Sequence, residues 1–229
     1  MLLQILTYTH HLTTMLFGIF LSAFFLGVKQ NKKNVCILLG GGAVSGLFFL
    51  ICNTVFGSLF TEAVYPIFVH LPLFLLLVFY YRFRWLPSII SIMTAYLCCQ
   101  FSTWAGIFAV SLSGLEWVYY LVRIIVTVAV FAFLSRYLCQ TTALLFAKSD
   151  RELYILGAMP FVYYVFDYST TKFSMLLYSG NKVVVEFLAF AMCISYVIFL
   201  FVYFQEYELK NSAEQYGQLT NMQLNSLHS

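Results

Sequence analysis

Charge is what this sequence has least of. Asp, Glu, Lys and Arg make up 9% of the 229 residues, whereas 62% are hydrophobic. Water-soluble domains carry about 25% charged residues, because a surface that faces water needs them. A chain with this composition cannot cover such a surface. We therefore exclude an ordinary soluble enzyme or a nucleic-acid-binding domain, and predict that lipid surrounds most of the chain.

Catalytic and metal-binding motifs are also lacking. The sequence contains no C-x-x-C pair, no Cys/His cluster with zinc spacing, and no H-E-x-x-H or G-x-S-x-G motif. The six cysteines fall in or beside apolar runs, where they act as small apolar residues rather than as a disulfide framework. A cysteine-peptidase pair of His70 with Cys98 or Cys99 has no spacing that requires it. We expect no enzyme activity, metal or cofactor in this chain.

Long apolar runs fill the sequence instead. A helix needs about 20 apolar residues to cross the bilayer core, and helices are favoured because they pair all their own backbone groups. The runs predict an all-α, polytopic membrane protein with about seven transmembrane helices. The predicted spans are residues 5–28, 35–56, 63–81, 86–110, 116–137, 153–171 and 183–204. The third is the weakest, because Pro66 and Pro72 interrupt it.

The basic residues predict the orientation. With the N-terminus outside, nine lie on the inner side and two, Lys172 and Lys182, on the outer side, while Arg123 lies within a span. This bias matches the positive-inside rule with the C-terminus in the cytoplasm. The nine inner residues are Lys29, Lys32, Lys33, Arg82, Arg84, Arg136, Lys148, Arg151 and Lys210.

The last residues differ in character from the rest. Residues 205–229 are polar, contain no proline, and predict a cytoplasmic helix that continues from the seventh span. Leu209, Ala213 and Tyr216 recur at 3–4 spacing, which suits a coiled-coil dimer as well as an amphipathic tail. We therefore divide the chain into a transmembrane domain, 1–204, and the start of a signalling helix, 205–229, at which the chain looks cut short.

Ionisable residues at membrane depth are costly, and they are the best indication of a site. Most of them gather in the predicted outer half of the membrane, beside several tyrosines. Two interpretations stay open: Arg123 pairs with Asp167 or Glu186 to hold helices together, or these groups line an outward-facing ligand pocket. The candidate ligand-sensing residues are Arg123, Asp167, Glu186, Tyr164, Tyr168 and His70.

Glycines cluster in the second predicted span. Gly42 and Gly46 form a G-x-x-x-G pair, which permits two helices to pack closely. No G-K-[ST] follows, so the cluster is not a phosphate-binding loop.

The sixth and seventh spans resemble a known family. The segment FDYSTTKFSMLLYSGNKVVVEFLAFAMCISYVIFLFVYFQEYELKNSAEQ, residues 166–215, is similar to the last two membrane helices of bacterial GHKL-domain sensor histidine kinases, the Agr-like receptors. The similarity rests on the DY-x-TT run from Asp167, LLYSGN from Leu176, VVEF from Val184 and YF-x-EYE from Tyr203.

The resemblance implies a function. It makes this chain the membrane sensor region of a two-component receptor, which detects an extracellular ligand such as a peptide and forms a homodimer through its C-terminal helix. The kinase that such a receptor drives has its phospho-accepting histidine and ATP-binding motifs further downstream, and none of them is in this sequence. A small multi-span transporter or channel-like protein is the alternative from another class.

Overall fold

The computed structural model describes residues 2–57, 65–147, 150–172 and 182–227. These residues form helices joined by short turns, with no strand among them, so the predicted all-α class is confirmed. The helices are α1 Leu2–Phe25, α2 Lys32–Phe56, α4 Tyr65–Phe68, α5 His70–Leu75, η1 Leu76–Tyr80, α6 Trp85–Cys98, α7 Gln100–Ser113, α8 Glu116–Tyr137, α9 Cys139–Phe146, α10 Asp150–Lys172 and α12 Lys182–Leu227.

Four helical segments of the described chain are long and apolar enough to cross a membrane. This length and composition make the chain a membrane protein, as predicted. The segments are Lys32–Phe56, Trp85–Ser113, Glu116–Tyr137 and Phe190–Gln218.

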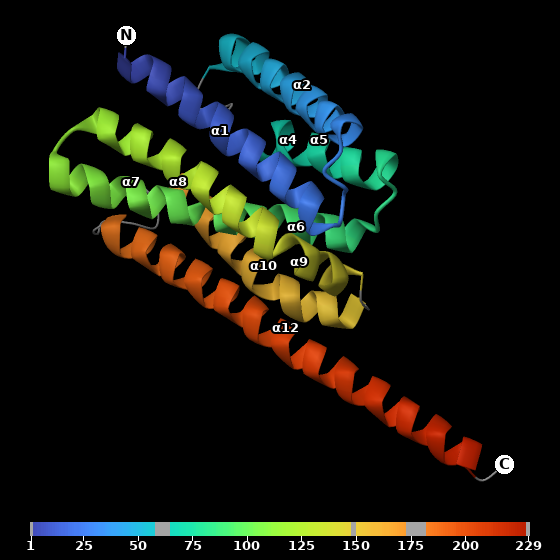
Figure 1. Ribbon diagram of the computed structural model, residues 1–229. Coiled ribbons are helices and arrows are strands. Elements are labelled where there is room, and N and C mark those ends of the chain that lie inside the picture. The colour runs from blue at the N-terminus through green and yellow to red at the C-terminus, as the bar shows by residue number, and fades with distance from the viewer. Residues whose placement is uncertain (1, 58–64, 148–149, 173–181, 228–229) are drawn as a thin grey trace. The chain divides into compact units, whose positions relative to one another are not determined.

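The chain divides into two compact units, Met1–Cys193 and Ile194–Ser229. In the first unit α1 runs alongside α8 and also contacts α6 and α9 (Figure 1). Aromatic rings fill the seam between α1 and α8: Phe131 of α8 lies 6.1–6.4 Å from three phenylalanines spaced along α1. These apolar contacts place α1 at the centre of the first unit.

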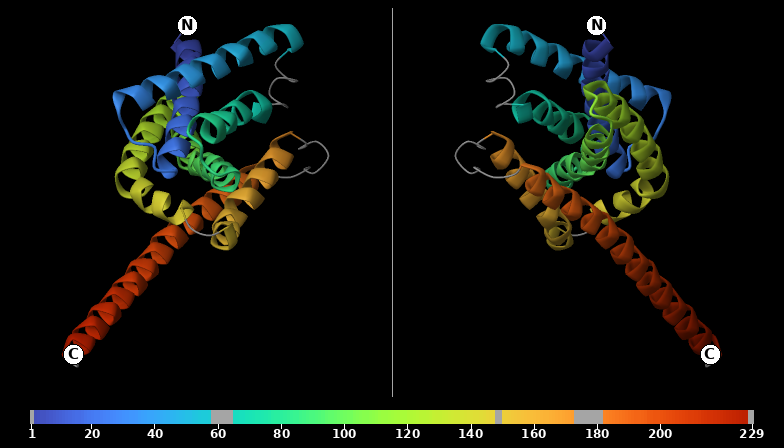
Figure 2. Two further views of the ribbon diagram at one scale, coloured as in Figure 1. Left: turned by 90° about the vertical axis from the view of Figure 1, so that its right-hand side faces the viewer. Right: turned by 90° about the vertical axis from the view of Figure 1, so that its left-hand side faces the viewer.

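Helix α2 crosses α1 at an angle (Figure 2). Gly42 lies at this crossing, where a Cβ atom would come within 2.9 Å of Ile19 Cδ1. Gly46 also faces α1, with 3.5 Å between the position of its Cβ and Met15 Cε. Both glycines therefore lie on the side of α2 that packs against α1.

The third predicted span, 63–81, is not one regular helix. Residues 58–64 lie outside the described part of the chain, and the remainder forms α4, α5 and the π-helical segment η1. Pro72 explains the interruption, because proline lacks a backbone N–H and its ring crowds the carbonyl of the preceding turn. A single π-helical turn, Leu76–Tyr80, follows and interrupts the α-helical hydrogen bonding.

Helices α6 and α7 together cover the fourth predicted span, with a break at Cys99. Helix α7 then turns back into α8 at Gly114, whose φ of 70° is readily adopted by glycine. The Gly114 N–H closes α7 by donating to the Val110 carbonyl at 2.8 Å. Helices α6 and α7 therefore correspond to predicted span 86–110, and α8 corresponds to predicted span 116–137.

The opposite end of the first unit brings three connections together; we call it the basic end. Gly27 faces Ala143 of α9, the Tyr81 hydroxyl donates to Asn34 at 3.5 Å, and Arg84 reaches the start of α10. The connection between the fifth and sixth predicted spans contains α9, whose Leu145 and Phe146 are apolar and fully or almost fully buried.

The second unit is the remainder of α12. This helix has 46 residues and continues from its apolar part through the polar segment to Leu227. The helical character predicted for residues 205–227 is therefore confirmed. Three large apolar side chains of the polar part, Leu209, Tyr216 and Met222, are exposed.

Candidate functional site

A carboxylate lies inside the first unit, away from the basic end. Asp167 is near the end of α10, about 25 Å along that helix from Asp150 at a rise of 1.5 Å per residue. Its Oδ2 atom accepts a 2.5 Å hydrogen bond from the hydroxyl of Tyr96 on α6. Tyr163, one turn earlier on α10, is fully buried and stacks obliquely on Tyr96 with 6.1 Å between ring centroids.

His70 extends this group to α5. Its Nδ1 atom is 2.8 Å from the Tyr164 hydroxyl, and its ring packs against Tyr96 and Tyr164 with centroid distances of 5.7 and 5.5 Å. Five side chains from three helices therefore form one connected group, which we call the aspartate cluster. Its members are His70, Tyr96, Tyr163, Tyr164 and Asp167.

Arg123 of α8 is held by a second group of side chains. Its Nη1 atom donates to the Tyr119 hydroxyl at 2.6 Å and its Nη2 atom donates to Thr103 Oγ1 on α7 at 3.1 Å. The guanidinium also lies 5.0 Å from the centre of the Tyr119 ring, a cation–π distance. These three residues form what we call the arginine cluster. His10 of α1 packs against the adjacent Tyr120, with 5.9 Å between ring centroids.

Gly106 makes room for Arg123 between α7 and α8. A Cβ atom on Gly106 would come within 2.5 Å of Arg123 Cγ and 3.0 Å of Tyr119 Cδ2. The aliphatic part of the arginine therefore lies directly against the α7 backbone. This contact fixes the direction in which the guanidinium points.

The predicted site residues fall into these two groups. Asp167, Tyr164 and His70 meet in the aspartate cluster, while Arg123 belongs to the arginine cluster. Arg123 makes no ion pair with Asp167, because its hydrogen-bonding groups are directed at Tyr119 and Thr103 instead. The side chains of Tyr168 and Glu186 lie outside the described part of the structure.

Tyr96, Thr103 and the adjoining Gly106 were not predicted from the sequence. Tyr96 and Thr103 carry polar groups in the middle of a long apolar run, and that position was the available signal. Gly106 stands alone in its helix and gave no such signal. Its role depends on which helix packs against it.

A separate apolar cleft of about 290 Å³ lies between α1, α2 and α5. Gly40, Gly41 and Pro72 contribute to its walls, and Ser45 is the one polar side chain among its lining residues. A cleft of this kind accommodates hydrocarbon but offers almost no hydrogen bonds. The aspartate and arginine clusters are therefore the stronger candidates for specific recognition. Within the described residues, no group of three or more His, Cys, Asp or Glu side chains is arranged to hold a metal ion.

No protein-family model matches the chain, and comparison with curated proteins and with solved structures finds no significant similarity.

Proposed function

We propose that this chain is the seven-span membrane sensor region of a sensor histidine kinase. In this proposal, an extracellular ligand such as a peptide binds at the outer side, and α12 relays the change to a kinase in the cytoplasm. The observation that carries the proposal is α12 itself. One helix of 46 residues begins in an apolar segment and extends without interruption into a polar segment.

The arrangement of the connections supports seven crossings. Residues 27–34, 81–84 and 138–147 and Asp150 gather at the basic end, while the Gly114 turn joins α7 and α8 at their other ends. This arrangement suits predicted spans that alternate in direction. Placing the basic end in the cytoplasm follows the positive-inside rule. Seven crossings that start from an outer N-terminus also end in the cytoplasm.

The same orientation gives the two polar clusters an outward position. Asp167 and Arg123 lie toward the Gly114 end of their helices, which becomes the extracellular end. A ligand that approaches from outside would meet these groups before any part of the basic end. If the ligand binds one of two arrangements of the helices more tightly than the other, it shifts the population toward that arrangement.

A helical relay requires two copies of α12 that act on each other. Leu209, Tyr216 and Met222 are apolar and exposed on the polar part of the helix, and a second copy would cover such side chains. A parallel dimer through residues 205–227 is therefore part of the proposal. Thr220 and Gln223 interrupt the apolar stripe, which suits a pairing weak enough to change with signal.

Disulfide crosslinking of the intact chain in bacterial membranes tests this proposal. Single cysteines are placed at successive positions from 206 to 223, in a background with Cys36→Ser and Cys99→Ser. These two are the native cysteines that are not buried. We expect crosslinked dimers to peak about every 3.5 residues, at 209, 213 and 216. Uniform or absent crosslinking, together with solute flux through proteoliposomes that contain the chain, would favour the transporter alternative.

A further inference from the structure

Arg123 is a cation inside an apolar helix, and no carboxylate of the described residues forms an ion pair with it. It lies in the first half of α8, a segment apolar enough to span a membrane. A charge at the centre of such a helix costs roughly 2.5–3.5 kcal/mol on insertion scales, so an intramembrane arginine indicates a structural or functional role. Its two side-chain hydrogen bonds go to a tyrosine and a threonine, both neutral.

The guanidinium keeps unused hydrogen-bonding capacity. Arginine has five N–H donors, and two hydrogen bonds hold its Nη atoms to neutral hydroxyl groups of Tyr119 and Thr103. Its Nε–H is buried and has no acceptor among the described residues. The Nε–H and the remaining Nη N–H groups present the fork that matches the two oxygens of a carboxylate or phosphate.

The rest of the arginine cluster fixes this fork in place. Gly106 allows the Arg123 side chain to lie against α7. The hydroxyl and ring of Tyr119 hold the guanidinium from α8, the helix that carries Arg123. Aromatic surface extends from Tyr119 to Tyr120, with 5.1 Å between the ring centroids. A fixed cation beside aromatic rings, in a medium of low dielectric, favours an anion that carries an apolar or aromatic group.

We propose that Arg123 binds one anionic group, a carboxylate or a phosphate, that enters from the Gly114 end of α7 and α8. This inference deepens the proposed sensor function and rests on it for the role of the ligand. A free ligand with a carboxylate and the phosphate of a lipid headgroup share this chemistry, and the experiment below separates them.

The test observes the Arg123 Nε–H directly by NMR in the intact chain, labelled with ¹⁵N at arginine. Arg123→Lys assigns the signal by its disappearance. The protein is held in maltoside micelles, which contain no phosphate, and is titrated with phenylacetate, with inorganic phosphate and with the neutral phenylacetamide. We expect phenylacetate or phosphate to shift the Arg123 signal saturably and phenylacetamide to leave it unchanged.

Two variants provide the comparison. Arg123→Gln should weaken phenylacetate binding by about tenfold to a hundredfold, the range for losing charge-assisted hydrogen bonds. Arg136→Gln removes an exposed arginine at the other end of α8 and should leave the affinity unchanged. In phosphatidylcholine nanodiscs, a signal already at the anion-bound position identifies lipid phosphate as the source. A signal that still moves with phenylacetate identifies a free carboxylate.

Two results would overturn the proposal. One is an Arg123 signal that no anion moves in micelles. The other is a ligand-free signal that moves when Glu186 is replaced by glutamine, because Arg123 would then already have a carboxylate of its own. The titration measures anion binding without any kinase, so a positive result would hold even if the proposed relay through α12 were wrong. A negative result would leave the relay to be judged by the pairing of α12.

Discussion

The hydroxyl of Tyr96 donates a 2.5 Å hydrogen bond to Oδ2 of Asp167, and this contact joins the last turn of α6 to the far part of α10. Tyr96 also packs against His70 and Tyr164, so α5, α6 and α10 meet at one tyrosine. A carboxylate away from water is costly unless hydrogen bonds satisfy it. Tyr96 is therefore expected to contribute to stability through Asp167 as well as through its ring.

A double-mutant cycle measures that contribution. Tyr96→Phe keeps the ring and removes the donor, so it should lower the free energy of unfolding by about 1–3 kcal/mol. Asp167→Asn removes the negative charge, and in its presence Tyr96→Phe should cost less. The measurement is chemical or thermal unfolding of the four proteins in maltoside micelles. A coupling energy of zero between the two substitutions would contradict this role of Tyr96.

Gly106 gives a prediction on the arginine cluster. Gly106→Ala places a Cβ atom 2.5 Å from Arg123 Cγ, which cannot move aside as the tip of a side chain can. We expect a loss of stability of about 1–3 kcal/mol from overpacking, together with a changed Arg123 Nε–H signal. Gly18→Ala is the matched control, because a Cβ atom on this glycine of α1 meets nothing within 4 Å. Equal behaviour of the two variants in unfolding experiments would show that α7 and α8 are not packed as described.

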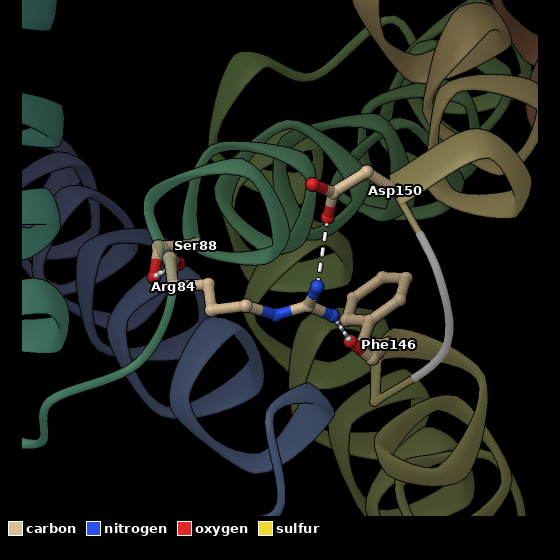
Figure 3. Close-up of polar contacts among 4 residues, drawn as sticks. All are labelled: Arg84, Ser88, Phe146 and Asp150. Atoms are coloured by element: carbon tan, nitrogen blue, oxygen red, sulfur yellow. Dashed lines mark hydrogen bonds and ion pairs between the residues drawn. The ribbon is translucent and has the colours of Figure 1, made fainter.

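Arg84 and Asp150 form an ion pair at the basic end, with 2.8 Å between Arg84 Nη1 and Asp150 Oδ1 (Figure 3). Arg84 also donates to the Phe146 carbonyl at 3.4 Å. The two side chains are 48% and 61% exposed, so water and salt screen the pair. Asp150→Asn should change the free energy of unfolding by less than about 1 kcal/mol, and salt should reduce the change further. A cost as large as that of Tyr96→Phe would contradict this assignment.

The long apolar helices could be predicted from the sequence. Residues 116–137 were predicted as one helix and form one, because an uninterrupted apolar run ends at Gly114 on one side and at polar residues on the other. The helix beyond residue 204 was also predictable, since the segment contains no proline. The break at Pro72 was visible as a weakness in the sequence, but the π-helical turn after it depends on local packing.

The polar contacts were only partly predictable. Because ionisable residues are costly at membrane depth, the sequence indicated Arg123 and Asp167 as candidate site residues. It did not indicate their hydrogen-bond partners. One interpretation paired Arg123 with Asp167 or Glu186. Arg123 donates instead to the hydroxyls of Tyr119 and Thr103 and does not pair with Asp167, whereas the Glu186 side chain lies outside the described residues. Which hydroxyl faces a charge is set by helix rotation and packing, and Gly106 sets the packing here. A single sequence does not contain that information in any local pattern.

The relay through α12 can be tested by rotating one part of the helix against the other. One to seven alanines are inserted after Gln205 in a fusion that joins the cytoplasmic catalytic region of a bacterial histidine kinase to Leu227. Each residue turns the downstream helix by about 100°, so two insertions reverse its face and seven nearly restore it.

Autophosphorylation of these fusions in membranes is the most direct measurement of the central claim. The relay predicts activity that rises and falls with the number of inserted residues, differs most from the parent at two, and returns toward it at four and at seven. Activity that is unchanged across the series, or that declines steadily with length, would contradict a helix that carries the state of the membrane region to a kinase.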